Sequence, residues 1–322
     1  MRAVQVEKFG GPEVLSVVET DDPEPSPGQV VVRTSAVDVL FLDTQLRSGW
    51  GRDYFEMEPP YVPGDGVAGD VVGLGSRVDP GWLGKTVVAS TGNAGTCAEL
   101  VAVDETELVE VPEGLDASAA VVLLHDASTA LLFAEHARIQ AGERVLVTAA
   151  AGGAGSILVQ LARSAGAQVV GAARGAAKLD LVRKLGAEPV DYGEPDWPEQ
   201  VRERTGGIDV VFDGAGGTIG ATAFGTTVNG ARVYSYGASS GDFAEIDQAK
   251  ARDKDVTVIG LLDIQYSSRA QRKSLLERAL REAAAGRVQP TIGASYPLGA
   301  VADAHADIEA RSVLGRAVLL PG

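Results

Sequence analysis

The sequence predicts an α/β fold, in which a doubly wound parallel sheet is joined to a mostly β domain. The 322-residue chain changes texture near Ala117: short strands and turns precede this point, and strands alternating with helices follow it. Such alternation is typical of a parallel sheet with helical crossovers. A glycine-rich loop that links a buried strand to a helix, at residues 144–155, is the third observation that favours this class.

The part before Ala117 reads as strands separated by turns. The N-terminus alternates like a strand, and the proline-rich segment at residues 21–28 is a turn signal. Further strands, rich in β-branched residues, are expected at residues 13–19, 29–37, 66–75 and 85–90.

The part after Ala117 alternates between two periodicities. Helices are expected at residues 155–166, 177–186, 198–206, 219–228 and 269–286. In the first of these, the apolar residues Ile157, Leu158, Leu161 and Ala165 share one face. Strands are expected at residues 144–150, 168–174, 189–193, 209–216, 231–237 and 256–261. A last strand at residues 315–320 is expected to return to the first domain.

Composition restricts the possible partners. The net charge is −16, and an acidic protein repels phosphate backbones, so nucleic acid is not expected as a partner. The single cysteine, Cys97, excludes an internal disulfide and a cysteine cluster for zinc. No apolar run reaches the roughly 18 residues of a membrane span. The N-terminus has no signal-peptide core, so a cytoplasmic protein is expected.

The loop AAGGAG, residues 150–155, predicts a dinucleotide site. Glycines here let the backbone approach a pyrophosphate and let the helix pack closely on the strand. The helix N-terminus adds free N–H groups and a positive dipole end. Ala150 stands where the usual fingerprint has glycine, and is tolerable if φ is negative there. The expected contacts are Gly152, Gly153, Ala154 and Gly155; a glycine-rich turn without a ligand is the alternative.

The end of the following strand indicates NADPH rather than NADH. An NAD site usually has an acidic residue about 20 residues after the loop, bonded to the ribose 2′-hydroxyl. Here Arg174 and Lys178 occupy that place, and the first acid, Asp180, lies within the helix. A guanidinium can hold a 2′-phosphate by two hydrogen bonds, whereas a carboxylate would repel it. Solvated surface charges are the alternative.

Four motifs carry a wider resemblance: AAGGAG, KLDLVRKLGAEPVDY, DVVFDGAGG and YVPGDGVAGDVVGLGSRV. Together they resemble the medium-chain dehydrogenase/reductases, and within them the zinc-free quinone oxidoreductases, or zeta-crystallin-like proteins. The resemblance covers essentially the whole chain. It implies a GroES-like domain formed by residues 1–118 and 262–322, a Rossmann domain at residues 119–261, and a nicotinamide in the cleft between them.

The resemblance also implies individual cofactor contacts. Lys178 and Tyr192 match residues that hold the adenosine 2′-phosphate, and Arg174 would strengthen that contact. Thr129 matches a helix threonine near the nicotinamide ribose, and Arg316 matches the basic residue of a C-terminal motif. The remaining expected contacts are Asp213, Gly237 and Leu261.

Zinc is not expected. The positions at which zinc-dependent relatives carry their ligands hold Leu40, Asp65 with Gly66, and His125. A catalytic zinc needs three protein ligands, and leucine cannot be one. Leu40 also replaces the asparagine of a motif common in the quinone oxidoreductase branch, so the exact substrate does not carry over.

Without a metal, the simplest reaction is hydride transfer from NADPH to a quinone or an α,β-unsaturated carbonyl compound, with a proton from solvent. An enoyl-thioester reductase, which shares this fold, is one alternative. A non-catalytic NADPH-binding protein of the crystallin type is another.

His125 and Asp65 are the candidate catalytic residues. Ligands of one metal lie within a few ångströms of each other, so these two side chains are expected to be neighbours beside the nicotinamide. A carboxylate raises the pKa of an imidazole, and His125 could then donate a proton to the acceptor. The alternative is a histidine bonded to Asp126 or to a backbone group, with no chemical role.

Aromatic residues suggest the acceptor pocket. The resemblance implies that Trp50, Tyr54 and Tyr61 lie on a loop that lines the cleft, together with Leu40, and flat rings there would suit a planar acceptor. The alternative is that the aromatic residues only pack the β domain. The strand at residues 256–261 is apolar and β-branched, and such an edge tends to aggregate unless it is paired. The resemblance implies that it pairs with the same strand of a second copy, which gives a homodimer.

Overall fold

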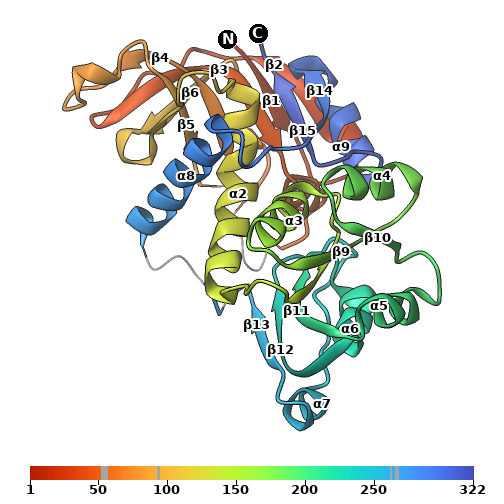
Figure 1. Cartoon of the computed structure of the whole chain (residues 1–322). Coiled ribbons are helices and arrows are strands. Elements are labelled where there is room, and N and C mark those ends of the chain that lie inside the picture. Colours follow the sequence, from red (N-terminus) through yellow and green to blue (C-terminus); the bar gives the residue numbers. More distant parts are fainter. Residues whose placement is uncertain (52–56, 93–94, 262, 265–267) are drawn as a thin grey trace. The chain divides into compact units, whose positions relative to one another are not determined.

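The computed structural model describes residues 1–51, 57–92, 95–261, 263–264 and 268–322 (Figure 1). The chain divides into two compact units. The first unit comprises Met1–His125 and Leu276–Gly322, and the second comprises Asp126–Leu275. The first unit is therefore built from both chain ends, while the expected domain boundaries at residues 118 and 261 stay a prediction.

The first unit is mostly β. Its strands are β1 (Arg2–Val6), β2 (Leu15–Glu19), β3 (Gln29–Val39), β4 (Gly66–Leu74), β5 (Thr86–Ser90), β6 (Leu100–Asp104), β7 (Val109–Glu110), β14 (Ile292–Pro297) and β15 (Arg316–Leu320). Its own α-helices are α1 (Phe41–Ser48) and α9 (Val301–Glu309). Short 3₁₀ helices cover Pro12–Val14, Pro80–Trp82, Glu105–Glu107 and Leu298–Ala300. Both units share α2 (Ala117–Ala137) and α8 (Arg269–Ala284).

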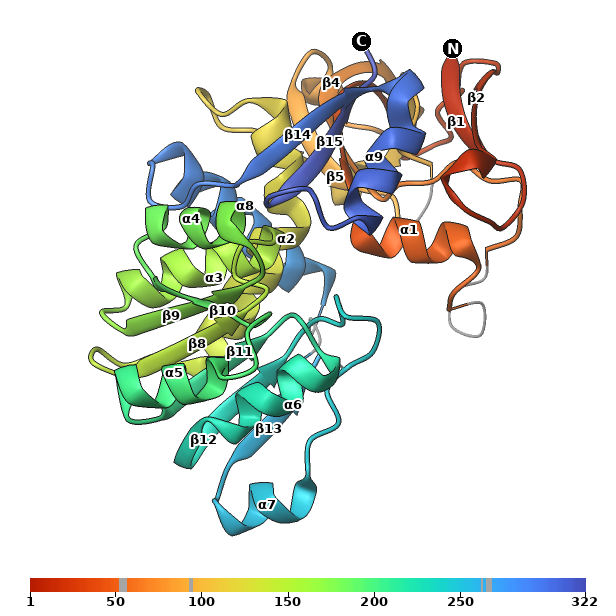
Figure 2. The same ribbon diagram turned by 90° about the vertical axis from the view of Figure 1, so that its right-hand side faces the viewer.

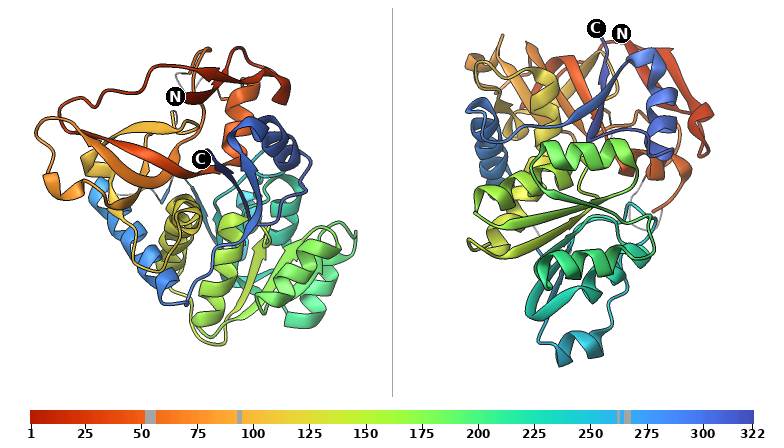
Figure 3. Two further views of the ribbon diagram at one scale, coloured as in Figure 1. Left: turned by 90° about the horizontal axis from the view of Figure 1, so that it is seen from above. Right: turned by 45° about the vertical axis from the view of Figure 1, so that its right-hand side comes forward.

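The main sheet of this unit joins the two ends of the chain. Its strand order is β14-β15-β3-β4-β5-β7, and β6 also pairs with β3. The last strand, β15, runs antiparallel to β3, with Val318 opposite Asp38. The Arg2 side chain donates to the Pro321 carbonyl at 3.1 Å, so both termini lie together (Figure 3). The expected return of the C-terminal strand is confirmed.

The second unit alternates strand and helix. Its strands are β8 (Arg144–Thr148), β9 (Gln168–Ala173), β10 (Glu188–Asp191), β11 (Ile208–Asp213), β12 (Thr227–Ser235) and β13 (Thr257–Gly260). Its helices are α3 (Gly153–Ser164), α4 (Ala176–Lys184), α5 (Trp197–Thr205), α6 (Gly217–Gly225) and α7 (Gln248–Asp253).

The six strands of the second unit form a parallel sheet in the order β10-β9-β8-β11-β12-β13. Helices α3 and α4 lie on one face of it, and α5 and α6 lie on the other (Figure 2). Val145, Leu146 and Val147 of β8 are fully buried because both faces are covered. Strands β9 and β10 are added on one side of β8, and β11 to β13 are added on the other side, so the strand order switches between β8 and β11. In sheets of this kind, ligands bind beyond the carboxyl ends of the strands at this switch point. The predicted doubly wound fold is confirmed.

Some elements differ from the sequence prediction. Helix α6 ends at Gly225, and Thr227 and Val228 already belong to β12, so the expected helix at 219–228 was too long. Helix α2 and the short helices α1, α7 and α9 were not predicted from the sequence pattern. Among the described residues, α2 is the one helix that is long and apolar enough to cross a membrane. Because 72% of its apolar window is buried inside the protein, it has the character of a core helix.

Candidate functional site

A glycine loop connects β8 to α3 in the second unit. Gly152 is the N-cap of α3 and provides no side-chain hydrogen bond, so the first turn of the helix has no cap from its own loop. Ala150 is not among the residues with positive φ; the left-handed conformation falls on Ala149, with φ 50°. The condition for tolerating alanine at position 150 is therefore met.

Gly155 has a packing reason to be glycine. A Cβ atom there would lie 2.3 Å from the Ala149 carbonyl oxygen and 3.1 Å from the Ala150 Cα, both of which are backbone atoms that cannot move aside. The helix can approach the strand this closely only without a side chain at this position. The expected role of Gly155 in helix–strand packing is confirmed.

The two expected cations follow the end of β9. Arg174 follows β9 and is exposed, and its guanidinium carbon lies 5.6 Å from the centre of the Tyr192 ring. Lys178 is half-buried in the first turn of α4. Sequence reasoning missed Asp191, whose carboxylate accepts hydrogen bonds from the Gly175 N–H at 3.1 Å and the Gly193 N–H at 2.7 Å. These amide donors offset its charge near Arg174.

Asp213 organises the carboxyl edge of the sheet. Its Oδ1 accepts from the Thr148 hydroxyl at 2.6 Å and from the N–H groups of Ala215 and Gly216 at 3.1 Å each. The Thr148 hydroxyl in turn accepts from Gly214 N–H at 3.0 Å. Burial raises the pKa of Asp213, although these hydrogen bonds lower it. The structure thus gives Asp213 a scaffold role, and its expected cofactor contact stays a prediction.

The other expected contacts of the second unit lie on different elements. Thr129 is half-buried on α2, and Leu261 follows β13 with 39% of its surface exposed. A Cβ at Gly237 would lie 2.8 Å from the Gly214 carbonyl oxygen, so the backbone at Gly237 passes too close to the backbone at Gly214 to leave room for a side chain. Ser128, next to Thr129, was missed: its hydroxyl is buried and has no hydrogen-bond partner in the described part of the chain. A single buried serine gives no sequence signal.

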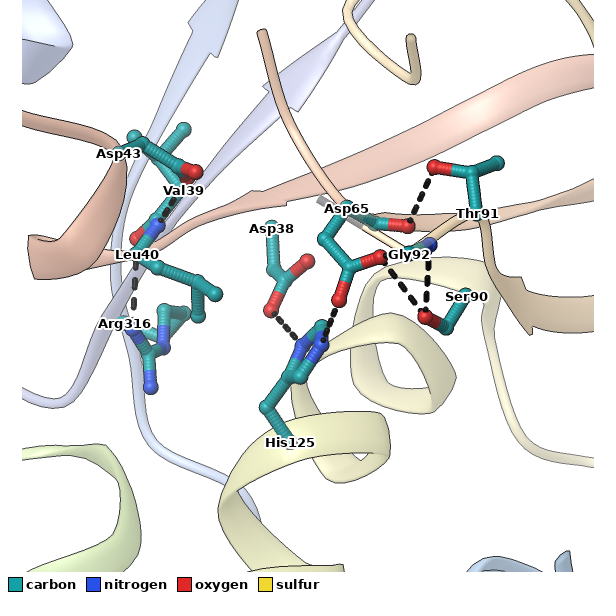
Figure 4. A network of polar contacts seen from close by, with 10 residues as sticks. All are labelled: Asp38, Val39, Leu40, Asp43, Asp65, Ser90, Thr91, Gly92, His125 and Arg316. Atoms are coloured by element: carbon teal, nitrogen blue, oxygen red, sulfur yellow. Dashed lines mark hydrogen bonds and ion pairs between the residues drawn. The ribbon is translucent and has the colours of Figure 1, made fainter. Parts of the chain in front are cut away.

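The most concentrated polar cluster lies in the first unit and is formed by Asp38, His125 and Asp65, here called the Asp–His–Asp cluster (Figure 4). The His125 Nδ1 lies 2.8 Å from Asp38 Oδ2, and its Nε2 lies 2.9 Å from Asp65 Oδ2. The other oxygen of Asp65 accepts from the Ser90 hydroxyl and the Gly92 N–H, both at 2.7 Å. The expected proximity of His125 and Asp65 is confirmed.

The ring of His125 in this cluster carries a positive charge at neutral pH. Although burial lowers the pKa of His125, the carboxylates of Asp38 and Asp65 raise it to about 10. At neutral pH the ring is therefore an imidazolium that donates both N–H groups, one to each carboxylate. The side chain of Asp38 is fully buried, whereas those of Asp65 and His125 are 14% and 24% exposed. Asp126, the partner that the sequence suggested, bonds to neither ring nitrogen, because Asp38 and Asp65 do.

Gly66 is glycine because of this cluster. A Cβ there would lie 2.3 Å from Asp38 Oδ1 and 3.1 Å from the His125 ring. Asp38 itself was missed, and its Oδ1 is buried without a hydrogen-bond partner in the described ranges. The expectation that His125 donates a proton is not tested by this geometry. A ring with both N–H groups bonded to carboxylates favours the alternative of a structural charge.

Leu40 directly follows β3 and is the N-cap residue of α1. Its N–H donates to Asp43 Oδ2 at 2.7 Å, and Arg316 donates to the neighbouring Val39 carbonyl at 3.4 Å. Burial raises the pKa of Asp43 to about 7, even though the Leu40 hydrogen bond lowers it. Within the described residues, no group of three or more His, Cys, Asp or Glu is arranged to hold a metal ion.

The structure describes two of the three aromatic residues expected around the acceptor, Trp50 and Tyr61. Trp50 is 46% exposed. Tyr61 is half-buried, and its hydroxyl has no hydrogen-bond partner among the residues described. Burial, followed by repulsion from Asp43, raises the pKa of Tyr61 to about 12. Tyr54 lies outside the described residues.

Two family models match the chain. The one described as alcohol dehydrogenase GroES-like domain matches residues 26–113, and the one described as zinc-binding dehydrogenase matches residues 153–280. The chain is 30% identical to a quinone oxidoreductase of Pseudomonas aeruginosa, over 99% of each protein. It is 31% identical to a 2-haloacrylate reductase of a Burkholderia species, over 99% of this chain and 98% of that protein. The crystal structure of Escherichia coli quinone oxidoreductase complexed with NADPH matches with a TM-score of 0.90 at 26% identity, covering 100% of both chains.

Proposed function

Because the chain belongs to the quinone oxidoreductases of the medium-chain dehydrogenase/reductase superfamily, we propose how its own residues serve the reaction of that family. The protein is an NADPH-dependent oxidoreductase that reduces a quinone or an α,β-unsaturated carbonyl compound. When bound, NADPH supplies the hydride, and the protein supplies binding, orientation and charge.

The second unit fits this cofactor, and the observation that carries the assignment is Arg174 stacked on Tyr192 at the strand end. We propose that these two residues and Lys178 hold the 2′-phosphate, since an exposed guanidinium is free to form two parallel hydrogen bonds with it. The first turn of α3, where Gly152 makes no side-chain cap hydrogen bond, is proposed to offer N–H groups to the pyrophosphate. The proposed contacts along the chain are Thr129, Gly152, Gly153, Ala154, Gly155, Asp213, Gly237, Leu261 and Arg316.

The acceptor takes its proton from solvent in this proposal. The ideal general acid has a pKa near the working pH, and the pKa of His125 is about 10. Both of its N–H groups already bond to carboxylates. We therefore propose that His125 and Asp65 stabilise the first unit as a fixed charge cluster and that proton donation by His125 is the alternative to be tested.

The acceptor pocket is proposed around Leu40, Trp50 and Tyr61, with Tyr54 as a further candidate from the sequence. An exposed indole and a half-buried phenol suit a planar acceptor by offset stacking. Zinc has no role in the proposal, because Leu40 cannot coordinate and the nitrogens of His125 are engaged.

Assembly and location are also proposals. Strand β13 lies at the edge of the six-stranded sheet and is only partly buried, so an edge-to-edge homodimer would cover it. Of the domain boundaries proposed from the sequence, the one after residue 118 falls in the first turn of α2 and the one after residue 261 falls just beyond β13. A cytoplasmic location fits the acidic composition and the buried core helix α2.

The test is oxidation of NADPH by the purified protein with a panel of quinones and enones, with and without a chelator. We expect turnover that the chelator leaves unchanged. Turnover only with enoyl thioesters would favour the enoyl-thioester reductase. NADPH binding without turnover of any acceptor would favour a crystallin-type protein, and loss of activity that zinc restores would overturn the metal-free mechanism.

A further inference from the structure

Asp191 connects the ends of two neighbouring strands of the second unit. Strands β9 and β10 run parallel, and their last residues, Ala173 and Asp191, are partners in the sheet. Beyond this pair, each strand continues into a turn. The Asp191 carboxylate accepts one hydrogen bond from each turn: Oδ2 from the Gly175 N–H at 3.1 Å, and Oδ1 from the Gly193 N–H at 2.7 Å. A single side chain is therefore bonded to both turns.

Each turn carries one residue of the proposed 2′-phosphate contact. Arg174 lies between two residues whose backbone is held, Ala173 by its place in the sheet and Gly175 by its hydrogen bond. Tyr192 directly follows Asp191, and its own N–H donates to the Ala173 carbonyl oxygen at 3.1 Å. The backbone on both sides of Arg174 is therefore fixed, although its side chain is exposed.

The Arg174 side chain lies against the turn that follows β10. A Cβ added to Gly193 would lie 3.5 Å from Arg174 Cγ and 3.7 Å from its Nε, so the arginine runs along the backbone of that turn. Its guanidinium carbon lies 5.6 Å from the centre of the Tyr192 ring. In the part of the chain that the structure describes, the guanidinium makes no ion pair with Asp191, whose oxygens bond to the two amides. The nearby acid thus sets the backbone around Arg174 without pairing with its charge.

We propose that Asp191 is a positioning residue that holds Arg174 and Tyr192 ready for the 2′-phosphate and so sets the preference for NADPH over NADH. This inference rests on the 2′-phosphate contact of the proposed function. An arginine loses side-chain freedom when it binds a ligand, and a turn that already restricts it lowers that cost. Loss of the Asp191 carboxylate is therefore expected to raise the Kd for NADPH by about 3–10-fold. A carboxylate that acted only through its charge would have the opposite effect, because its removal would tighten the binding of a phosphate.

The test is titration calorimetry of the intact chain with NADPH and with NADH. Asp191→Ala removes both hydrogen bonds and should raise the Kd for NADPH while leaving the Kd for NADH unchanged. Asp191→Asn also removes the charge but keeps one carbonyl oxygen as an acceptor, so its effect should be smaller. Glu194→Ala, which removes an exposed carboxylate three residues further along the chain, is the matched control and should change neither value.

A double-mutant cycle determines whether Asp191 acts through Arg174. In an Arg174→Ala background, Asp191→Ala should have no further effect on the Kd for NADPH. If the wild type binds neither cofactor, or binds both equally, the proposed 2′-phosphate contact itself fails. If the wild type prefers NADPH and Arg174→Ala weakens that preference, the inference is overturned when Asp191→Ala leaves the Kd for NADPH unchanged, lowers it, or raises it equally without Arg174. Thermal unfolding shows whether each variant folds, and Asp191→Asn carries the same cycle if Asp191→Ala does not.

Discussion

The Asp–His–Asp cluster of the first unit and the glycine loop with Arg174 in the second unit contrast in how their polar groups are satisfied. In the cluster, each ring nitrogen of His125 has a carboxylate partner within 2.9 Å. In the second unit, Arg174 is exposed and the first turn of α3 lacks a cap from its own loop. Polar groups that are paired inside the protein stabilise it, whereas donors presented at the surface are available to a ligand.

This difference matters because sequence position alone suggested chemistry for both regions. The resemblance puts His125 at the position of a zinc ligand, but both of its ring nitrogens lie within 2.9 Å of a carboxylate oxygen. The cofactor contacts proposed for the second unit rely on simpler features, namely a helix N-terminus and a cation at a strand end. The predictions below test whether the two regions do separate into a stabilising cluster and a ligand site.

The largest expected effect is on stability. His125→Ala leaves two carboxylates close together in the interior, and breaking a buried ion pair costs about 3–5 kcal/mol. The free energy of unfolding, measured by urea titration, should fall by about this amount. His136→Ala is the control: this exposed histidine makes one hydrogen bond, at 3.2 Å to Tyr234, and should cost about 1 kcal/mol. Equal losses in both variants would mean that the cluster is not a special source of stability.

The second effect is the pH dependence of the same stability. The pKa of His125 rises from 6.5 to about 10 on folding, so the folded state holds a proton that the unfolded state releases in this range. The contribution is complete below pH 6.5 and is lost as pH rises through about 10. Urea midpoints of the wild type should therefore fall between pH 7 and 10, and those of His125→Gln should fall much less. Parallel curves for the two proteins would contradict a charged His125.

The third effect concerns the exposed region. Arg174→Ala removes the charge-assisted contacts to the 2′-phosphate, each of which contributes about 1.5–3 kcal/mol. The Kd for NADPH should rise by about 10–100-fold, while the Kd for NADH stays the same. Arg183→Ala is matched in charge and lies on α4, where Arg183 pairs with Asp180 at 2.5 Å, and it should change neither value. Equal Kd values of the wild type for NADPH and NADH would refute the phosphate assignment.

The glycine loop and Arg174 could be predicted because their signals are local. Strand, loop and helix follow one another within some twenty residues, and apolar periodicity marks each of them. The residues of the cluster are far apart in the chain: Asp38 and His125 are separated by 87 positions. In addition, Asp38 stands next to apolar residues near the end of β3, and an acidic residue there indicates the end of a strand rather than a partner for a histidine. Only the folded sheet shows that Asp38 and α2 meet.

The missed helices have a physical explanation as well. Helix α2 is apolar around most of its circumference, and such a helix shows no polar stripe from which its period could be read. Helices α1 and α9 are short, with 8 and 9 residues, so tertiary packing rather than local propensity stabilises them. Helix α1 contributes the buried Arg47, which pairs with Glu309 of α9, and no local pattern announces a contact between segments so distant in the chain.

The smallest expected effect is on catalysis, and it tests the contrast between the two regions most directly. A general acid contributes about 10²–10⁴-fold to a rate, provided that it can release its proton at the working pH. His125 holds its protons between two carboxylates, with a pKa of about 10. His125→Gln keeps polar groups that can bond to Asp38 and Asp65. With NADPH saturating, its kcat should stay within about twofold of the wild type, with the same pH profile. A fall of about a hundredfold, with an ionisation missing from the profile while NADPH still binds normally, would instead make His125 the proton donor, and the cluster would then be part of the active site.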